Sequence, residues 1–284
     1  MRRQLFYTFL LSISTLHASP DWYWQGKFSL AEQDMLMEWV EEADTSVEKL
    51  FGPLPYNFNV YFYQQEGSEP VPWAHTTKGI EKSVHFYVSM AHTKEEFIDD
   101  WTVYHELAHL LFPYLGSNSA WFAEGIASYL QYQFMYANNV ITWNEGVNKL
   151  KERFRRARIQ HIYDDISITQ LSEIFKQTKA YVRLYWGGAA YFANVDMRLF
   201  NEQGIRLNNV IYDYLKCCAK RRVRGAQNMI RLFDDISNST IFSEVFDETV
   251  NHKGFPATHQ AVVWLRNHPP PFYSQLINLR SHHQ

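Results

Sequence analysis

The residues with the clearest capacity for chemistry are His105, Glu106 and His109, which follow the spacing His-Glu-x-x-His. On an α-helix, residues four positions apart lie on the same face, one turn from each other, so both imidazoles can point at one metal ion. Zinc accepts such ligands and lowers the pKa of a bound water toward ~7. Glu106 follows the first histidine and leans toward the position of that water, where a carboxylate can accept its proton. These residues predict zinc-assisted hydrolysis, provided that a third ligand comes from elsewhere.

Glu124 is the candidate for that third ligand, because a catalytic zinc ion usually has three protein ligands and a water. It is separated from His109 by 14 residues, a gap that accommodates a helix end, a turn and the first part of an antiparallel helix. The residues around Glu124 are mostly apolar, and a carboxylate in such surroundings is costly unless a charge meets it. We therefore expect His105, His109 and Glu124 to bind one zinc ion per chain.

The segments that carry these residues resemble the gluzincin metallopeptidases. The likeness lies in His-Glu-x-x-His at residues 105–109 and in Trp-aromatic-x-Glu-Gly-x-x-Ser-Tyr at residues 121–129. It is greatest to the M1 and M61 aminopeptidase group and its small "peptidase MA-like" relatives. The resemblance implies that the two histidines and Glu124 are the zinc ligands, that Glu106 is the general base, and that the fold is a thermolysin-like zincin domain.

The same resemblance implies a tyrosine that stabilises the oxyanion from the start of a later helix. Tyr185, in Tyr-Trp-Gly-Gly-Ala-Ala, is the matching position, and Tyr181, one turn earlier, is the alternative. The chain has no Gly-x-Met-x-Asn segment ahead of residue 105, which M1 enzymes use beside the substrate backbone and amino end. The resemblance therefore implies a peptide or protein substrate but leaves aminopeptidase and endopeptidase activity open.

The elements ahead of the motif follow from apolar periodicity and capping signals. A helix is expected over residues 29–51 and a strand over 57–64, whereas 66–78, with its prolines and glycine, is expected to be a loop. A second strand is expected over 83–90, and it could form the edge along which an extended peptide pairs. These elements predict a small N-terminal α/β lobe over residues 20–92.

The motif itself is expected on a helix over residues 93–112, ended by Pro113, and Glu124 on a helix over 120–138. The rest of the chain keeps the helical pattern, and its tail after residue 268 is expected to be irregular. Further helices are expected over 144–157, 169–178, 179–201, 207–220, 226–236, 241–252 and 258–267. The predicted fold is therefore α+β and mostly helical, with a helical zinc-binding lobe over residues 93–284.

Residues 1–19 have the composition of an export signal. Arg2 and Arg3 precede a mostly apolar run over residues 5–16, and small residues follow at Ala18 and Ser19. The run is short for a membrane span, and no other stretch approaches the ~20 apolar residues that a span needs. We expect a periplasmic or secreted protein with no stable membrane span after signal removal.

Composition limits the remaining possibilities. The chain of 284 residues has a formal net charge of −3, which gives no electrostatic case for binding nucleic acid. The basic run over residues 151–158 is interpreted as a solvated helix face. Cys217 and Cys218 are adjacent and are expected to be unpaired helical residues, because a disulfide there would close almost no loop. The sequence does not indicate an oligomeric state.

Two other classes of protein are consistent with the motif. A catalytically inactive peptide-binding protein could retain the zincin fold, but it would have no need for Glu106. A structural zinc site usually has four protein ligands with cysteine among them, and both cysteines here lie far from residue 105 in sequence. A zinc metallopeptidase is therefore the preferred hypothesis.

Overall fold

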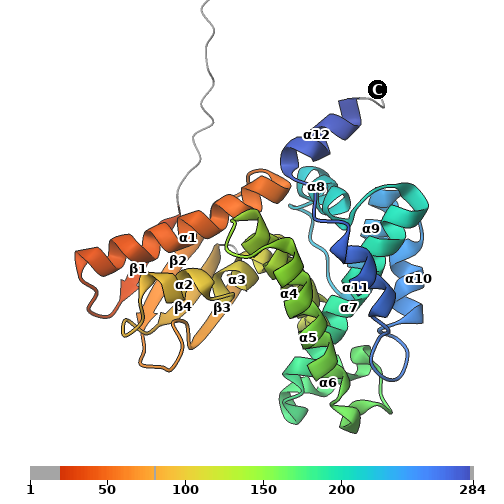
Figure 1. Ribbon diagram of the computed structural model, residues 1–284, viewed down its shortest axis with the longest axis horizontal. Coiled ribbons are helices and arrows are strands. Elements are labelled where there is room, and N and C mark those ends of the chain that lie inside the picture. The colour runs from red at the N-terminus through yellow and green to blue at the C-terminus, as the bar shows by residue number, and fades with distance from the viewer. Residues whose placement is uncertain (1–19, 80, 282–284) are drawn as a thin grey trace, which may run out of the picture.

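The computed structural model describes residues 20–79 and 81–281, which form a small lobe of strands and helices beside a larger helical lobe (Figure 1). The predicted export signal at residues 1–19 lies outside the described residues. Within the described ranges, no helix is long and apolar enough to cross a membrane. The architecture is the mostly helical α+β fold with a small N-terminal lobe that the sequence predicts.

The N-terminal lobe consists of helix α1 (Leu30–Phe51) packed across a four-stranded sheet (Figure 1). Ser29 and Glu32 form a capping box at the start of α1, as their spacing predicts. The buried face of α1 meets the buried face of the sheet, where Trp39 packs edge-on against Phe86 with ring centroids 5.1 Å apart. The strands are β1 (Asp21–Gln25), β2 (Asn59–Gln64), β3 (Trp73–Lys78) and β4 (Lys82–Val88).

The strand order is β1-β2-β4-β3, in which β3 is antiparallel to β4 and the other neighbouring pairs are parallel. Two sequence predictions are wrong here. Residues 66–78 are not all loop, because their second half is β3. The strand predicted over 83–90 is present as β4, but it lies inside the sheet and so cannot be the edge that pairs with a peptide. Pairing with β4 and packing against the helix over residues 102–110 stabilise β3, and neither contact is visible in its local composition. The edge next to the His-Glu-x-x-His motif therefore belongs to β3.

The helix predicted over residues 93–112 is divided into α2 (Lys94–Asp99) and α3 (Thr102–Leu110). The break falls at Asp100, whose backbone is extended and whose carboxylate accepts a 2.7 Å hydrogen bond from the amide of Thr102. Aspartate competes for free amides at helix starts and is a weak helix former, so local chemistry accounts for the break. The whole His-Glu-x-x-His motif lies on α3.

The helical lobe is centred on α4 (Ala120–Ala137), which packs between α3 and α7 (Tyr181–Gln203). The helices predicted beyond residue 138 are all present. Within the tail, residues 273–281 form a helix rather than irregular structure, because Leu276 is buried and this segment packs against α1. The other helices are α5 (Trp143–Arg158), α6 (Ile168–Thr178), α8 (Leu207–Cys217), α9 (Ala226–Ser237), α10 (Ile241–Glu248), α11 (His259–Arg266) and α12 (Tyr273–Ser281).

A buried polar network fixes α4 relative to α7 and α8. The Tyr129 hydroxyl of α4 donates a 2.7 Å hydrogen bond to the carboxylate of Asp196 on α7, and the Arg206 guanidinium pairs with the same carboxylate at 2.7 and 2.8 Å. The charged groups are satisfied by one another, which buried charges require. Tyr129 of the Glu-Gly-x-x-Ser-Tyr segment is therefore a structural tie between the helices that carry Glu124 and Tyr185.

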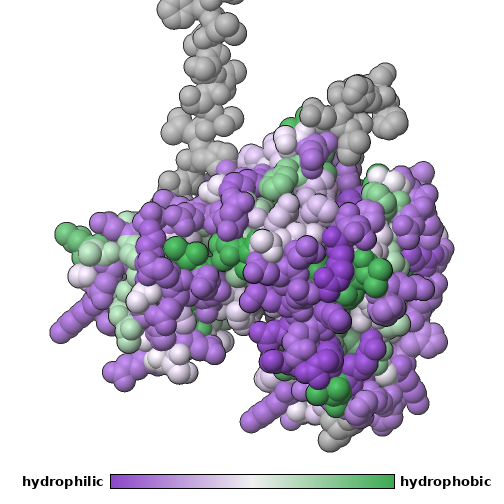
Figure 2. All heavy atoms as spheres, viewed as in Figure 1, coloured by the Kyte–Doolittle hydropathy of each residue, from purple (hydrophilic) through white to green (hydrophobic). Residues whose placement is uncertain are grey.

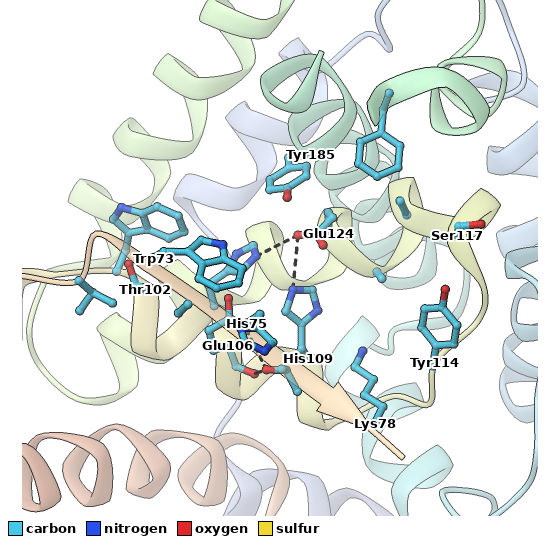
Figure 3. Close-up of a pocket in the computed structure, with 18 of the residues that line it drawn as sticks. Trp73, His75, Lys78, Thr102, Glu106, His109, Tyr114, Ser117, Glu124 and Tyr185 are labelled. Carbon is cyan, nitrogen blue, oxygen red and sulfur yellow. Dashed lines mark hydrogen bonds and ion pairs between the residues drawn. The ribbon is translucent and has the colours of Figure 1, made fainter. Parts of the chain in front are cut away.

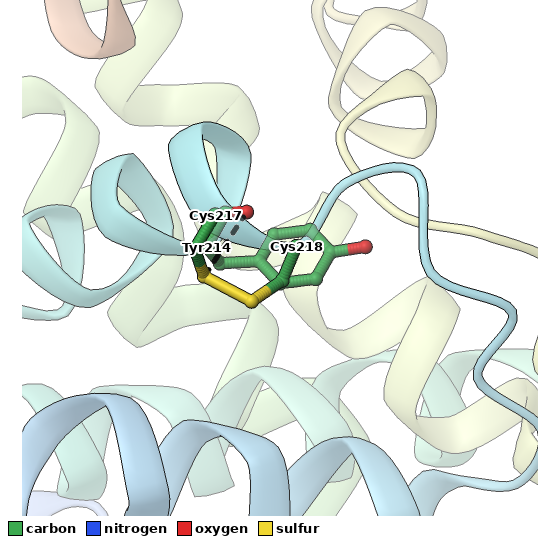
Figure 4. The surroundings of a disulfide bond; sticks show 3 residues. All are labelled: Tyr214, Cys217 and Cys218. Carbon is green, nitrogen blue, oxygen red and sulfur yellow. Dashed lines mark hydrogen bonds between the residues drawn. A yellow bond between two sulfur atoms is a disulfide. The ribbon is translucent and has the colours of Figure 1, made fainter.

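Cys217 and Cys218 are joined in a disulfide beside Tyr214, contrary to the expectation of unpaired cysteines (Figure 4). That expectation assumed that both residues continue the helix. The helix ends at Cys217, and the backbone of Cys218 has φ −137°, so the two side chains need not diverge. A bond between neighbours closes almost no loop, so it contributes little to the stability of the fold.

The basic run on α5 lies on the surface, as predicted. Lys151, Arg155, Arg156 and Arg158 are exposed, and the region around α5 in Figure 2 is predominantly hydrophilic. Arg155 and Arg156 both pair with Glu152 on the same helix, at 2.7 and 2.9 Å. The run is thus a solvated helix face with local ion pairs.

Candidate active site

The structure brings His105, His109 and Glu124 together between α3 and α4. The Nε2 atoms of the two histidines lie 3.2 and 3.4 Å from the same Glu124 carboxylate oxygen, and the candidate ligand atoms all lie within 4.8 Å of one another (Figure 3). Two ligands that each bind a tetrahedral zinc ion at 2.0–2.1 Å are about 3.3–3.4 Å apart. The nitrogen–oxygen separations match the edges of that tetrahedron, and the donor set of two imidazoles and a carboxylate suits zinc. These residues therefore fit the metal.

Gln131, two turns beyond Glu124 on α4, orients the first histidine. Its side-chain oxygen lies 3.0 Å from Nδ1 of His105, and both groups are buried. An amide oxygen can only accept, so Nδ1 carries a hydrogen and Nε2 is the ring atom that would bind a metal in place of its own proton. The sequence reasoning missed Gln131. A buried amide on the same face as a candidate ligand, seven positions on, is the signal that could have found it.

Glu106 lies in the same pocket and is held by β3. The Thr76 hydroxyl lies 2.8 Å from a carboxylate oxygen of Glu106 and 3.0 Å from the Glu106 backbone carbonyl. Only 7% of Glu106 is exposed, so its carboxylate faces the pocket rather than open solvent. No local pattern marks Thr76, because its contact depends on β3 lying beside α3.

Tyr185 lines the pocket from α7 and faces Glu124, with its ring stacked 6.1 Å from that of His105 (Figure 3). The alternative, Tyr181, is 41% exposed and is not among the residues that line the pocket. Burial and the nearby charges of Glu124 and Glu106 raise the pKa of Tyr185, so the phenol keeps its proton at neutral pH. The geometry favours Tyr185 over Tyr181 as a hydrogen-bond donor to a group bound in the pocket.

Two glycines allow the helices that carry Glu124 and Tyr185 to touch. A Cβ atom added at Gly188 on α7 would lie 2.0 Å from the Trp121 carbonyl oxygen on α4, and one added at Gly125 would lie 2.5 Å from the backbone of Gly188. Such distances leave no room for a side chain at either position. The Glu-Gly and Gly-Gly pairs of the sequence thus place the candidate third ligand and the candidate tyrosine in one pocket.

Glu124 and His105 each stabilise the charged form of the other, and His109 also stabilises that of Glu124. Burial opposes ionisation of Glu124, yet the charge of His109 and the hydrogen bonds of His105 and His109 lower the pKa of Glu124 well below its usual range. Burial would lower the pKa of His105, but the hydrogen bond and charge of Glu124 outweigh it and raise that pKa. The partly buried carboxylate is therefore stabilised by a positive group, which is the environment that a metal cation would supply.

The pocket around the cluster has a volume of about 510 Å³ and runs along β3. In Figure 3, Trp73 and Thr102 lie at one end, and Lys78, Tyr114 and Ser117 lie at the other. Three further histidines lie in different surroundings. His75 lines this pocket, His85 stacks between neighbouring rings on the sheet, and His92 lies 3.1 Å from Glu96 at the start of α2.

Comparison by sequence finds no matching protein family and no matching curated protein. Comparison of structures finds an aminopeptidase N family protein from Idiomarina loihiensis, with a TM-score of 0.64 and 15% identity over 84% of this chain and 46% of that one. An M1 zinc metallopeptidase from Deinococcus radiodurans gives a TM-score of 0.53 and 15% identity over 83% and 48%. A mutant from that organism, bound to a Tyr-Ser-Ala substrate, gives 0.53 and 14% over 82% and 47%.

These similarities define the class of fold. The chain has the zincin-like fold found in M1 zinc metallopeptidases, as the resemblance of its motifs predicts. It spans about half the length of the solved structures that it matches. The identity of 15% shows the fold alone, so the activity of this chain rests on its own residues.

Proposed function

We propose that this protein is a zinc-dependent metallopeptidase in which His105, His109 and Glu124 hold the metal. The observation that carries the proposal is the match of the 3.2 and 3.4 Å separations to the edges of a zinc tetrahedron, with Glu106 beside them in a pocket large enough for a peptide. Similarity in fold to M1 zinc metallopeptidases supports the same conclusion.

The proposed reaction assigns a separate task to each remaining residue. A bound zinc ion would activate water and polarise the peptide carbonyl. Glu106 accepts the proton of the attacking water and delivers it to the leaving amine. Thr76 holds the Glu106 carboxylate through the 2.8 Å hydrogen bond. Tyr185, kept protonated by its raised pKa, donates to the oxygen on which negative charge develops.

The substrate proposed for the site is an extended peptide that lies along β3. This strand forms the edge of the sheet next to α3, and Trp73 and Thr76 on it line the pocket. An edge strand offers unpaired backbone groups that can pair with a peptide and present its carbonyl groups in register. The peptide-pairing edge is thus proposed on β3 rather than on residues 83–90.

The test combines metal analysis with peptide cleavage. Purified protein should hold about one zinc ion per chain, as a three-ligand site requires. Glu106→Gln should retain that zinc and lose cleavage of a peptide mixture with free and blocked N-termini, whereas Glu173→Gln, an exposed change on α6, should retain both. Cleavage by Glu106→Gln at the wild-type rate, or absence of zinc from the wild type, would overturn the proposal. The blocked peptides distinguish endopeptidase from aminopeptidase activity.

A further inference from the structure

Lys78 is a cation in the pocket for which the proposed reaction has no use. It is the last residue of β3, and in Figure 3 its side chain extends between His109 and Tyr114, at the opposite end of the pocket from Trp73. Within the described part of the chain, no carboxylate forms an ion pair with Lys78. A lysine ammonium offers three donors and no acceptor, so a partner for it must be an acceptor and is best an anion.

The surroundings of Lys78 also favour an anion from outside the protein. Tyr114 and Ser117 line the same end of the pocket with hydroxyl groups. Lys176 of α6 is a second cation among the residues that line the pocket. The acidic residues that line the pocket are Glu69, Glu106 and Glu124. Glu106 and Glu124 have assigned tasks at the centre. An ammonium group placed at the Lys78 end would be repelled, whereas a carboxylate would be attracted and hydrogen-bonded.

We propose that Lys78 is a specificity-determining residue that binds a carboxylate of the peptide substrate at this end of the pocket. The carboxylate belongs either to an acidic side chain or to the C-terminus, and both present the same two oxygens to the ammonium. The inference rests on the proposed peptidase function, of which it names the substrate class: peptides that are anionic close to the bond that is cleaved.

Lys82 provides a matched control for Lys78. It is the partner of Lys78 across the β3–β4 pair, so the same charge is removed from the same hairpin when either is changed. Its ammonium lies over the ring of Tyr56, 3.1 Å from the centroid, and Lys82 does not line the pocket. Lys78→Met and Lys82→Met therefore separate a role in the pocket from a general effect of charge.

The experiment measures both binding and cleavage of alanine-based pentapeptides, made with free and with acetylated N-termini so that aminopeptidase and endopeptidase activity are both covered. Each peptide carries one glutamate at a chosen position, its twin carries glutamine there, and every sequence is made with a C-terminal carboxylate and with an amide. Binding is measured by calorimetry on the zinc-loaded Glu106→Gln protein, and KM and kcat are measured on the protein with Glu106 intact. The comparison of glutamate with glutamine peptides then reports binding of a side-chain carboxylate, and the comparison of free with amidated C-termini reports binding of a C-terminal carboxylate.

We expect at least one carboxylate peptide to bind about 10- to 100-fold more tightly than its amide twin, which is the usual range for a hydrogen bond to a charged group. Lys78→Met should abolish that preference, mainly through KM, and Lys82→Met should retain it. Equal binding of all twins, no binding of any peptide, or an unchanged preference in Lys78→Met would overturn the inference. Cleavage without a preference for carboxylate peptides would leave the peptidase proposal intact and overturn the role of Lys78. Preferred binding of carboxylate peptides without any cleavage would support the role of Lys78 as a carboxylate-binding residue and overturn the peptidase proposal.

Discussion

Gly188→Ala should destabilise the protein strongly, whereas Gly187→Ala, its neighbour on α7, should be nearly neutral. An added Cβ at Gly188 lies 2.0 Å from the carbonyl oxygen of Trp121, and backbone on α4 cannot rotate away. A carbon in ordinary contact sits at about 3.5 Å, so α4 and α7 must separate by roughly 1 Å or more. At Gly187 the new methyl meets only side-chain atoms of Ile168, Cδ1 at 2.6 Å and Cγ1 at 2.8 Å, and this side chain can change rotamer where backbone cannot.

The expected size of the difference follows from two terms. Replacing glycine by alanine inside a helix gains about 1 kcal/mol in either variant. At Gly187 a strained Ile168 rotamer costs about 0.5–1.5 kcal/mol, so the two terms nearly cancel. At Gly188 the free-energy cost of overpacking against backbone should lie at or beyond the upper end of the usual range for overpacked cores, about 1–3 kcal/mol. We therefore expect Gly188→Ala to be about 2 kcal/mol or more less stable than Gly187→Ala.

Urea unfolding of both variants, followed by circular dichroism with a chelator present, measures this difference in the free energy of unfolding. The chelator removes stabilisation by bound metal, which would otherwise obscure the comparison. Failure of Gly188→Ala to accumulate as folded protein, while Gly187→Ala does, has the same meaning as a large loss of stability. The reasoning is refuted if Gly188→Ala is as stable as Gly187→Ala, because α4 and α7 would then not be in backbone contact.

Three further predictions concern the site. Gln131→Leu should weaken zinc binding about 10- to 100-fold in a chelator competition, because Nδ1 of His105 loses its acceptor; unchanged affinity would contradict that role. Thr76→Val should lower kcat about 10-fold at unchanged zinc content, since the Glu106 carboxylate loses a hydrogen bond, and Thr76→Ser should restore it. Tyr185→Phe should lower kcat about 100-fold. Because burial and the charges of Glu124 and Glu106 raise the pKa of Tyr185, the metal-free wild type and Tyr185→Phe should give the same ultraviolet tyrosine titration up to pH 10; an additional phenolate near pH 9 in the wild type alone would refute this.

Some elements were predictable because the physics that forms them is local. The capping boxes at Ser29 and Thr93 set helix starts within a few residues, and the periodic apolar pattern located most of the later helices. The break at Asp100 was also encoded locally, by an aspartate that accepts from the amide two residues on, but it was hidden within a longer apolar stripe. Errors of this kind concern element boundaries rather than the fold.

The strands, in contrast, depend on contacts between segments that are distant in sequence. Residues 73–78 have few apolar residues and become a strand because they pair with β4 and pack beside α3. Since the sheet order is decided by contacts between segments far apart in sequence, no local pattern could assign the edge to β3 rather than to β4. The same holds for α12, which is stabilised by packing on α1.

The sequence by itself determined the candidate metal ligands, because His105 and His109 are one helical turn apart and Glu124 stands out as a charge among apolar residues. Only the tertiary structure decided what surrounds them. Gln131, Thr76 and Lys78 reach the site through helix packing and strand pairing, and Tyr185 reaches it because Gly125 and Gly188 let two backbones meet. Ligand spacing within one helix is a short-range property of the chain, whereas the shape and charge of a pocket depend on how distant segments pack.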